Sequence, residues 1–137
     1  MPAALRPVIR VAAAVILDDT GRLLLVRKSG TRFFMQAGGK IEPDESPRAA
    51  LARELAEEIG VDLDADEFEY LGRFDTAAAN EHGHALDAEL FAVRVTGAVA
   101  AASEIAELVW IERANPGGLP LAPLTLDIVL PLLEQQG

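Results

Sequence analysis

The sequence predicts an α/β fold, and three observations support this class. Residues Val8 to Leu17 form a nearly unbroken apolar stretch rich in β-branched side chains, which is typical of a buried strand. Residues 47 to 59 repeat their apolar side chains every four positions, as an amphipathic helix does. Further strand-like stretches and a helical C-terminal segment follow. Because 137 residues suit one ordinary domain, we expect a single domain over residues 1–137.

The first element predicted is a β-hairpin. Val8 to Leu17 provides one strand and Leu23 to Arg27 the other. The segment between them, Asp18-Asp19-Thr20-Gly21-Arg22, contains a glycine suited to a turn. Two apolar runs joined this way favour antiparallel strands that lie side by side.

Basic residues gather just after this hairpin. Arg27 and Arg32, with Lys28 between them, are candidates to face the phosphate of a substrate. The alternative is that they are ordinary exposed charges, since basic side chains are mostly exposed in proteins. The following Gly38-Gly39 pair permits a backbone bend that no other residue type allows as readily.

The next element predicted is a helix from Pro47 to Ile59. Ser46 is a good N-cap, and Pro47 suits the first helical position. Gly60 suits a left-handed residue that ends a helix. These start and stop signals agree with the apolar stripe on one face, so the helix bounds are well specified.

Three glutamates stand together on another face of this helix. Glu54, Glu57 and Glu58 are spaced i, i+3 and i+4, so we expect their carboxylates to converge. Like charges at this spacing destabilise a helix by a few tenths of a kcal/mol per pair. A bound Mg²⁺, which prefers oxygen ligands and shares its shell with phosphates, would offset the repulsion. The alternative is a solvated acidic face.

Strands and one more helix complete the prediction. Strand-like stretches cover residues 68–74, 87–95 and 108–111, and a polar loop that includes Asn80 joins the first two. We take that loop as a candidate substrate contact. Residues 124–134 show helical periodicity, and Pro131 is expected to kink or shorten that helix.

Composition narrows the class of partner. The chain has 22 acidic and 12 basic residues, a net charge of −10, which disfavours a nucleic-acid polymer. It has no cysteine, so an intracellular, cytoplasmic location is expected. No apolar run is long enough to span a bilayer, so no membrane association is expected. The oligomeric state is left open, a homodimer included.

The segment from residue 39 to residue 61 closely resembles the Nudix box of the Nudix (MutT-type) hydrolases, G-x5-E-x7-R-E-U-x-E-E-x-G-U, where U is a bulky aliphatic residue. Every defined position is filled, by Gly39, Glu45, Arg53, Glu54, Leu55, Glu57, Glu58, Gly60 and Val61. The resemblance implies an α/β/α sandwich with a mixed sheet between the box helix and the C-terminal helix.

The resemblance also implies a function. Nudix hydrolases use Mg²⁺, which Mn²⁺ can replace, to break the diphosphate bridge of a small nucleotide. By that likeness the metal ligands are Gly39, Glu54, Glu57 and Glu58, and Arg53 is held by Glu45 while it orients a helix carboxylate. The general base is left open among Glu57, Glu58 and Glu104, the last chosen only because the family often places a carboxylate in that region. Glu45 and Gly60 are structural positions of the motif.

The substrate within the family is less well specified. Residues 77–79 are all alanine, where subgroups acting on ADP-ribose often have a proline and those acting on dinucleoside polyphosphates a tyrosine. We therefore expect a nucleoside triphosphate, modified or not, cleaved to the monophosphate and pyrophosphate. A nucleotide sugar or ADP-ribose is the alternative among substrates. A Nudix domain that binds a nucleotide without turnover, as a sensor, is the alternative of another class, and a merely structural acidic helix is a third reading.

Overall fold

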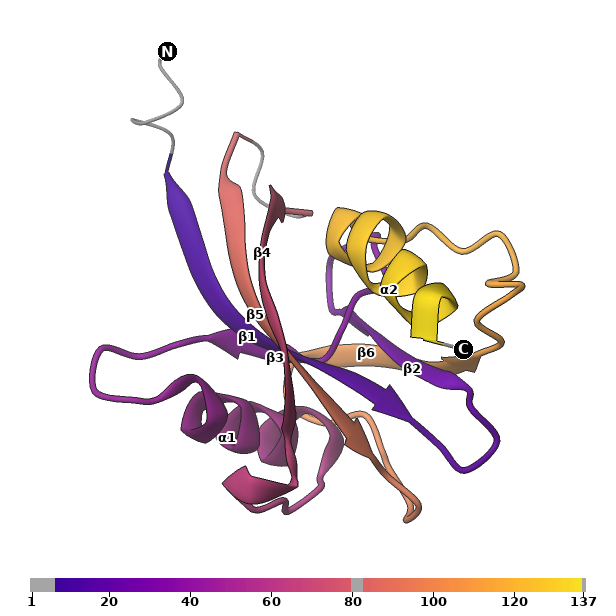
Figure 1. Cartoon of the computed structure of the whole chain (residues 1–137), viewed down its shortest axis with the longest axis horizontal. Coiled ribbons are helices and arrows are strands. Elements are labelled where there is room, and N and C mark those ends of the chain that lie inside the picture. The colour runs from indigo at the N-terminus through magenta and orange to yellow at the C-terminus, as the bar shows by residue number, and fades with distance from the viewer. Residues whose placement is uncertain (1–6, 80–82, 137) are drawn as a thin grey trace.

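The computed structural model describes residues 7–79 and 83–136, and it confirms the α/β class (Figure 1). Its elements, in chain order, are β1 (Val8–Leu17), β2 (Leu23–Lys28), β3 (Gly38–Lys40), α1 (Pro47–Ile59), the 3₁₀ turn η2 (Ala65–Glu67), β4 (Glu69–Ala77), β5 (Ala85–Arg94), β6 (Ile105–Ile111), the π-helical segment η3 (Leu124–Val129) and α2 (Leu130–Gln136).

The sheet is mixed, as the resemblance implies. Its strand order is β4-β5-β1-β2-β6, and β3 pairs with β1 off this path. β1 and β5 run parallel over the whole of β1, from Val8 to Leu17, whereas the other pairs of strands are antiparallel. β1 is therefore the central strand, and both of its faces are covered.

Alternate residues of β1 point into two separate cores. Ala12, Ala14 and Ile16 pack with the apolar stripe of α1, and we call this cluster the α1-side core. Ala13 and Val15 pack with η3 and α2, and we call this cluster the α2-side core. The two helices thus cover opposite faces of the sheet, which completes the α/β/α sandwich (Figure 1).

The predicted hairpin is only partly formed. Its strands have the expected bounds to within one residue, but β1 and β2 pair only beside the turn, at Leu17 and Leu23. Further from the turn, β1 pairs with β3 on that side, and β2 pairs along its length with β6. The predicted hairpin is confirmed beside its turn, and long-range partners take the backbone groups further along both strands.

Helix α1 begins and ends as predicted. The Ser46 side chain accepts a hydrogen bond from the Ala49 N–H, an N-cap that contributes about 1 kcal/mol. Gly60 ends the helix in the left-handed region, at φ 72°. Leu51, Leu55 and Ile59 are all fully buried, so this stripe fixes which face of α1 meets the sheet.

The C-terminal helix differs from the prediction. Pro131 neither ends nor shortens the helical segment, which runs on to Gln136. Instead the turns before it widen into the π-helical segment η3, in which the Leu130 N–H donates to the Thr125 carbonyl. In an ordinary α-helix the proline ring would clash with the carbonyl four residues earlier, and a wider turn relieves that clash.

The three later strands exist, with shifted bounds. β4 ends three residues beyond the predicted strand over 68–74, β5 begins two residues before the one over 87–95, and β6 begins three residues before the one over 108–111. Sheet partners extend strands beyond what local alternation shows. Within the described residues, no helix is both long and apolar enough to cross a membrane.

Candidate active site

The acidic motif spans β3 and α1, and its glycines let these two elements meet. A Cβ atom added to Gly38, whose φ is 147°, would lie 2.2 Å from the Ala12 carbonyl oxygen of β1. A Cβ atom added to Gly39 would lie 2.4 Å from the carboxyl carbon of Glu54. Only glycine fits at position 38, and a side chain at position 39 would displace the Glu54 carboxylate, so the backbone of β3 is packed directly between the central strand and a helix carboxylate.

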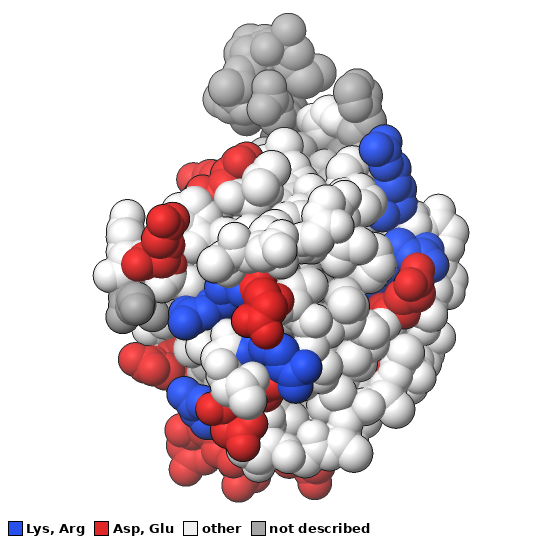
Figure 2. Space-filling view, turned by 90° about the vertical axis from the view of Figure 1, so that its right-hand side faces the viewer, with Lys and Arg blue, Asp and Glu red and all other residues white. Residues whose placement is uncertain are grey.

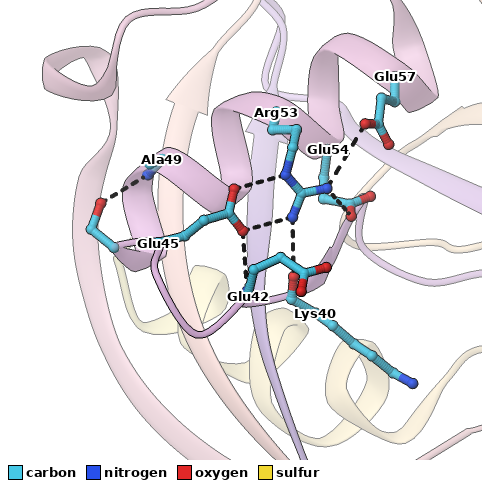
Figure 3. A network of polar contacts seen from close by, with 8 residues as sticks. Lys40, Glu42, Glu45, Ala49, Arg53, Glu54 and Glu57 are labelled. Atoms are coloured by element: carbon cyan, nitrogen blue, oxygen red, sulfur yellow. Dashed lines mark hydrogen bonds and ion pairs between the residues drawn. The ribbon is translucent and has the colours of Figure 1, made fainter.

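Arg53 is the centre of a charged network on α1 (Figure 3). Its Nε and Nη2 donate to the two carboxylate oxygens of Glu45 at 2.7 and 2.8 Å. Its Nη1 donates to Glu54 at 2.9 Å and lies 3.8 Å from a Glu57 oxygen. The predicted contacts of Arg53 with Glu45 and with a helix carboxylate are thus confirmed. The bidentate geometry fixes the guanidinium plane, and with it the position of Glu54.

These ion pairs shift the pKa values of both Glu45 and Arg53. Hydrogen bonds from Arg53, against the opposing effect of burial, lower the pKa of Glu45 to about 2. Hydrogen bonds to Glu45 in turn raise the pKa of Arg53 above its ordinary value. Both groups therefore stay charged at neutral pH.

Glu58 turns inward and is buried, with 5% of its surface exposed. Its Oε1 accepts a hydrogen bond from the Gly38 N–H at 3.0 Å. Burial raises the pKa of Glu58 to about 7, although the Gly38 bond and the Lys28 charge act in the other direction. The nearby negative charges of Glu54 and Glu104 raise this pKa further. A buried carboxylate with carboxylate neighbours is a point of excess negative charge.

The three helix glutamates do not converge as the spacing predicted. Arg53 draws Glu54 aside, the Gly38 N–H draws Glu58 inward, and the Glu57 side chain remains 53% exposed. Among residues 7–79 and 83–136, no group of three acidic or histidine side chains is close enough to hold a metal ion. Helical spacing makes the residues neighbours, but each carboxylate then follows its own hydrogen-bond donor.

Glu104 lies at the rim of the same region. It follows Ser103, a non-glycine residue with a positive φ of 55°, and it directly precedes β6. Its carbonyl accepts from the Ser29 N–H at 2.7 Å, and its negative charge raises the pKa of Glu58. The loop before it also closes onto the end of α1, since the Ala102 N–H donates to the Glu58 carbonyl. The structure therefore brings Glu104 near Glu58, as its selection required.

A cavity opens beside the motif, on the α2 side of the sheet. Its wall includes Val11, Ala13 and Leu124, which belong to the α2-side core. The motif residues Gly39 and Lys40 line one end of it, but none of the three helix glutamates does. The lining residues are Ile9, Val11, Ala12, Ala13, Lys28, Met35, Gln36, Gly38, Gly39, Lys40, Ala77, Ala78, Ala79, Leu86, Ala122 and Leu124. The cavity is thus largely apolar and adjoins the charged network at β3.

The basic residues before the motif separate in the structure. Arg27 donates to Glu107 and to the Thr31 carbonyl, and Arg32 stacks over the ring of Phe33. Neither arginine lines the cavity, whereas Lys28 does. Successive residues of a strand point to opposite faces, so β2 divides these charges between two environments. Asn80, the third predicted substrate contact, lies outside the described residues.

The charged side chains of one face are mixed in sign. On the face drawn in Figure 2, Lys and Arg side chains are scattered among Asp and Glu and form no continuous basic stripe. A protein that follows a nucleic-acid backbone needs such a stripe. The expectation that the partner is no nucleic-acid polymer stays a prediction.

The comparison with protein families decides the identification. The model of the NUDIX domain matches residues 7–126, most of the chain. The chain belongs to the Nudix hydrolase family. Its box occupies β3 and α1, and its fold is the one that the family resemblance implied.

Two relatives are similar to this Nudix hydrolase over nearly the whole chain. A CTP pyrophosphohydrolase of Escherichia coli is 35% identical over 130 residues, which cover 92% of this chain and 89% of the relative. The solved structure of the E. coli ORF135 protein is 30% identical, with a TM-score of 0.75, and covers 100% of this chain and 96% of its own.

A more distant structure shares the fold at 21% identity and a TM-score of 0.74, covering 98% of this chain and 44% of its own. It is a bifunctional NMN adenylyltransferase/ADP ribose pyrophosphatase of Francisella tularensis in complex with AMP and a Mn ion.

Two residues of this Nudix hydrolase were not predicted as site residues: Gln36, which lines the cavity, and Thr125, which contacts Gln36. Gln36 is a polar residue between apolar neighbours, and that interruption is the only signal its position gives. Thr125 carries no local signal, because it reaches Gln36 only through the fold of the C-terminal segment. Lys28 belongs to the predicted basic cluster, and the alternation of side chains along β2 separates it from Arg27.

Proposed function

We propose that this Nudix hydrolase cleaves a nucleoside triphosphate to a nucleoside monophosphate and pyrophosphate, with the aid of Mg²⁺ or Mn²⁺. The observation that carries the proposal is the largely apolar cavity that ends at Gly39 and Lys40. Sites for small ligands combine apolar walls with a few polar groups. The base and sugar would occupy the cavity, and the phosphates would extend over β3 toward the carboxylates of α1.

The groups around β3 fit a hard divalent cation. The available donors are oxygens, namely the Gly39 carbonyl and the carboxylates of Glu54, Glu57 and Glu58. Glu54 is already in contact with Gly39, and the Oε1 of Glu58 accepts a hydrogen bond from the neighbouring Gly38 N–H. When bound there, the cation supplies charge neutralisation on phosphate oxygens and a lowered pKa of the attacking water.

The protein's own groups have distinct duties in this proposal. Arg53 holds Glu54 in place through its bidentate pair with Glu45, so its role is positioning. Lys28 and Lys40, at the cavity wall, face the phosphates; the Lys40 side chain points away from the Arg53 network (Figure 3). Glu57, Glu58 or Glu104 accepts the proton of the attacking water.

The experiment that tests this function is a turnover assay in ¹⁸O-labelled water. Purified protein is incubated with Mg²⁺ and a panel of nucleotides, and the products are resolved by mass. We expect triphosphates to yield monophosphate and pyrophosphate, with the label in one of these two products. Attack at the α-phosphorus puts ¹⁸O into the monophosphate, and attack at the β-phosphorus puts it into pyrophosphate.

Two outcomes would replace the proposal. A kcat/KM for ADP-ribose or a nucleotide sugar a hundredfold above every triphosphate would move the substrate class within the family. Binding of nucleotides without turnover of any would make the protein a sensor.

A further inference from the structure

A buried polar pair links a residue of the cavity wall, Gln36, to the C-terminal segment behind it. Gln36 lies just before β3, and Thr125 lies in the π-helical segment η3, 89 residues further along the chain. The Thr125 hydroxyl donates to the Gln36 Oε1 at 2.9 Å. Thr125 is fully buried and Gln36 is 5% exposed, so both are removed from bulk water.

The orientation of the Gln36 amide is determined by its partners. Its Nε2 donates to the Ala14 carbonyl of β1 at 3.0 Å. A carbonyl can only accept, so the amide nitrogen must face Ala14 and the amide oxygen must face Thr125. A rotation of the amide by 180° would set two acceptors against each other in a buried place. The side chain is therefore held in one orientation.

This amide still has hydrogen-bonding capacity. It carries two N–H groups and an oxygen that accepts two hydrogen bonds. Within residues 7–79 and 83–136 it makes the two side-chain bonds to Ala14 and Thr125 and no others. One donor and one acceptor site remain, on a residue that lines the cavity.

The chemistry around Gln36 makes it distinctive. Among the described residues of the cavity wall, it is the one uncharged polar side chain. Most of the others are aliphatic, and the two lysines present positive charge suited to phosphate. Aliphatic walls accept any flat base alike, whereas a site that hydrogen-bonds a polar edge can reject an analogue that lacks the matching group.

We propose that the amide of Gln36 selects the nucleobase by hydrogen bonds to its polar edge, and that Thr125 positions this amide. The proposal rests on the proposed function, because it assumes that the cavity receives the base of the substrate. The ligand class is a nucleotide whose base offers an amino or carbonyl group beside a ring nitrogen.

A fixed amide can tell two kinds of base apart. Cytosine presents an amino donor beside a ring acceptor, whereas uracil presents a carbonyl acceptor beside a ring N–H. One fixed donor and one fixed acceptor match only one of these edges at a given position. The mismatched base leaves buried polar groups unpaired, which costs affinity. We therefore expect CTP and UTP, which have the same ring size, to differ.

The test compares kcat/KM for CTP and UTP in the wild type, in Gln36→Leu and in Thr125→Val. In the wild type we expect a ratio of about tenfold or more between the two nucleotides. Gln36→Leu reduces the ratio to below about threefold, since both hydrogen bonds are lost. Thr125→Val removes the donor that fixes the amide, so its ratio falls between the other two values. This second variant keeps the test decisive if Gln36→Leu fails to fold.

A matched control separates selection from stability. Leu133 is 4% exposed in the α2-side core and lines no part of this cavity. Leu133→Ala is expected to lower the melting temperature and to leave the CTP to UTP ratio unchanged. A wild-type ratio near one overturns the proposal. So does a parallel loss for both nucleotides in Gln36→Leu, which would show a purely structural bond.

Failure of the proposed function gives a result different from failure of base selection by Gln36. If the wild type hydrolyses no triphosphate of the nucleotide panel, that function fails. If it hydrolyses neither CTP nor UTP, calorimetric binding of CMP and UMP to the same proteins decides the inference. A wild-type ratio of dissociation constants that collapses in Gln36→Leu supports base selection. Equal affinities in the wild type, or no binding at all, overturn it.

Discussion

The two sides of β3 differ in how their polar groups are arranged. On the α1 side, charged groups are close together and paired: Arg53 alone joins Glu45 and Glu54. On the α2 side, the described part of the cavity wall is mostly aliphatic, with two lysines and one uncharged polar side chain, Gln36. Stabilising the charge of reacting phosphates requires fixed charged groups like those on the α1 side. Binding a flat, largely apolar base requires an apolar cavity like the one on the α2 side. We therefore propose that cleavage and recognition lie on opposite sides of one short strand.

The largest effect is expected from the carboxylates of α1. Glu58→Gln and Glu57→Gln are each expected to lower kcat/KM by more than about 100-fold, because loss of a direct metal ligand exceeds the 10–100-fold loss for its outer partners. The melting temperature stays the same or rises, since a negative charge leaves a crowded acidic region. The new amide oxygen at position 58 can still accept the Gly38 N–H.

Glu134→Gln provides the control for these two variants. Glu134 is exposed on α2, on the other side of the sheet, and its substitution by Gln removes the same charge. Steady-state rates at saturating Mg²⁺ and thermal melts measure both effects. Near-full activity in either Glu57→Gln or Glu58→Gln would remove that residue from the proposed metal site.

Arg53→Ala is expected to affect both rate and stability. Its loss frees Glu54 and leaves Glu45 unpaired, so kcat/KM falls about 10–100-fold. The lost charge-assisted bonds cost about 1–2 kcal/mol. Arg53→Lys keeps the charge without the bidentate geometry and is expected to recover stability more than rate. A variant Arg53→Ala with unchanged rate and melting temperature would disprove the positioning role.

The basic residues test where the phosphates run. Lys28 lines the cavity and lies close enough to Glu58 to lower its pKa, so Lys28→Ala is expected to raise KM about tenfold through the loss of a charge near phosphate. Arg32→Ala removes the same charge from a side chain stacked on Phe33, and we expect less than a twofold change. The reverse order of the two KM values would place the substrate on the Arg32 side.

The smallest effect is expected in the contribution of the Glu45–Arg53 pair to stability at acid pH. The pKa of Glu45 is lowered from 4.5 to about 2 in the folded protein. A group with a lowered pKa stabilises the fold above its unfolded value and loses that contribution as pH falls toward its folded value. The difference in melting temperature between wild type and Glu45→Gln is thus expected to be full above pH 5 and to shrink from pH 4.5 toward pH 2. A constant difference over this range would contradict the Glu45–Arg53 assignment.

The sequence predicted the charged side far better than the cavity. Ser46, Pro47 and Gly60 mark α1 by local chemistry. The Nudix resemblance implied the Arg53 contacts, whose partners lie in the helix and in the loop before it. Local rules suffice where the partners are close in sequence. The outward orientation of the Glu57 side chain and the inward orientation of the Glu58 side chain were not predictable, because they depend on β3.

The cavity, in contrast, is built from segments far apart in the chain. Gln36 and Thr125 meet across 89 residues, and Thr125 is placed by a π-helical segment that Pro131 favours. The pattern around Pro131 predicted a kink, and only the observed wide turn shows where Thr125 lies. Non-local strand pairing also explains why β1 and β2 separate after the predicted turn.

The central claim is that the two sides of β3 divide binding and chemistry, and one crystal structure tests it most directly. The protein would be crystallised with Mn²⁺ and a non-hydrolysable analogue of CTP, and the metal located by its anomalous signal. We predict the metal peak among Gly39, Glu54, Glu57 and Glu58, with the base on the other side of β3 against Ala13 and Gln36. A base bound on the α1 side, or a metal peak inside the cavity, would contradict the account.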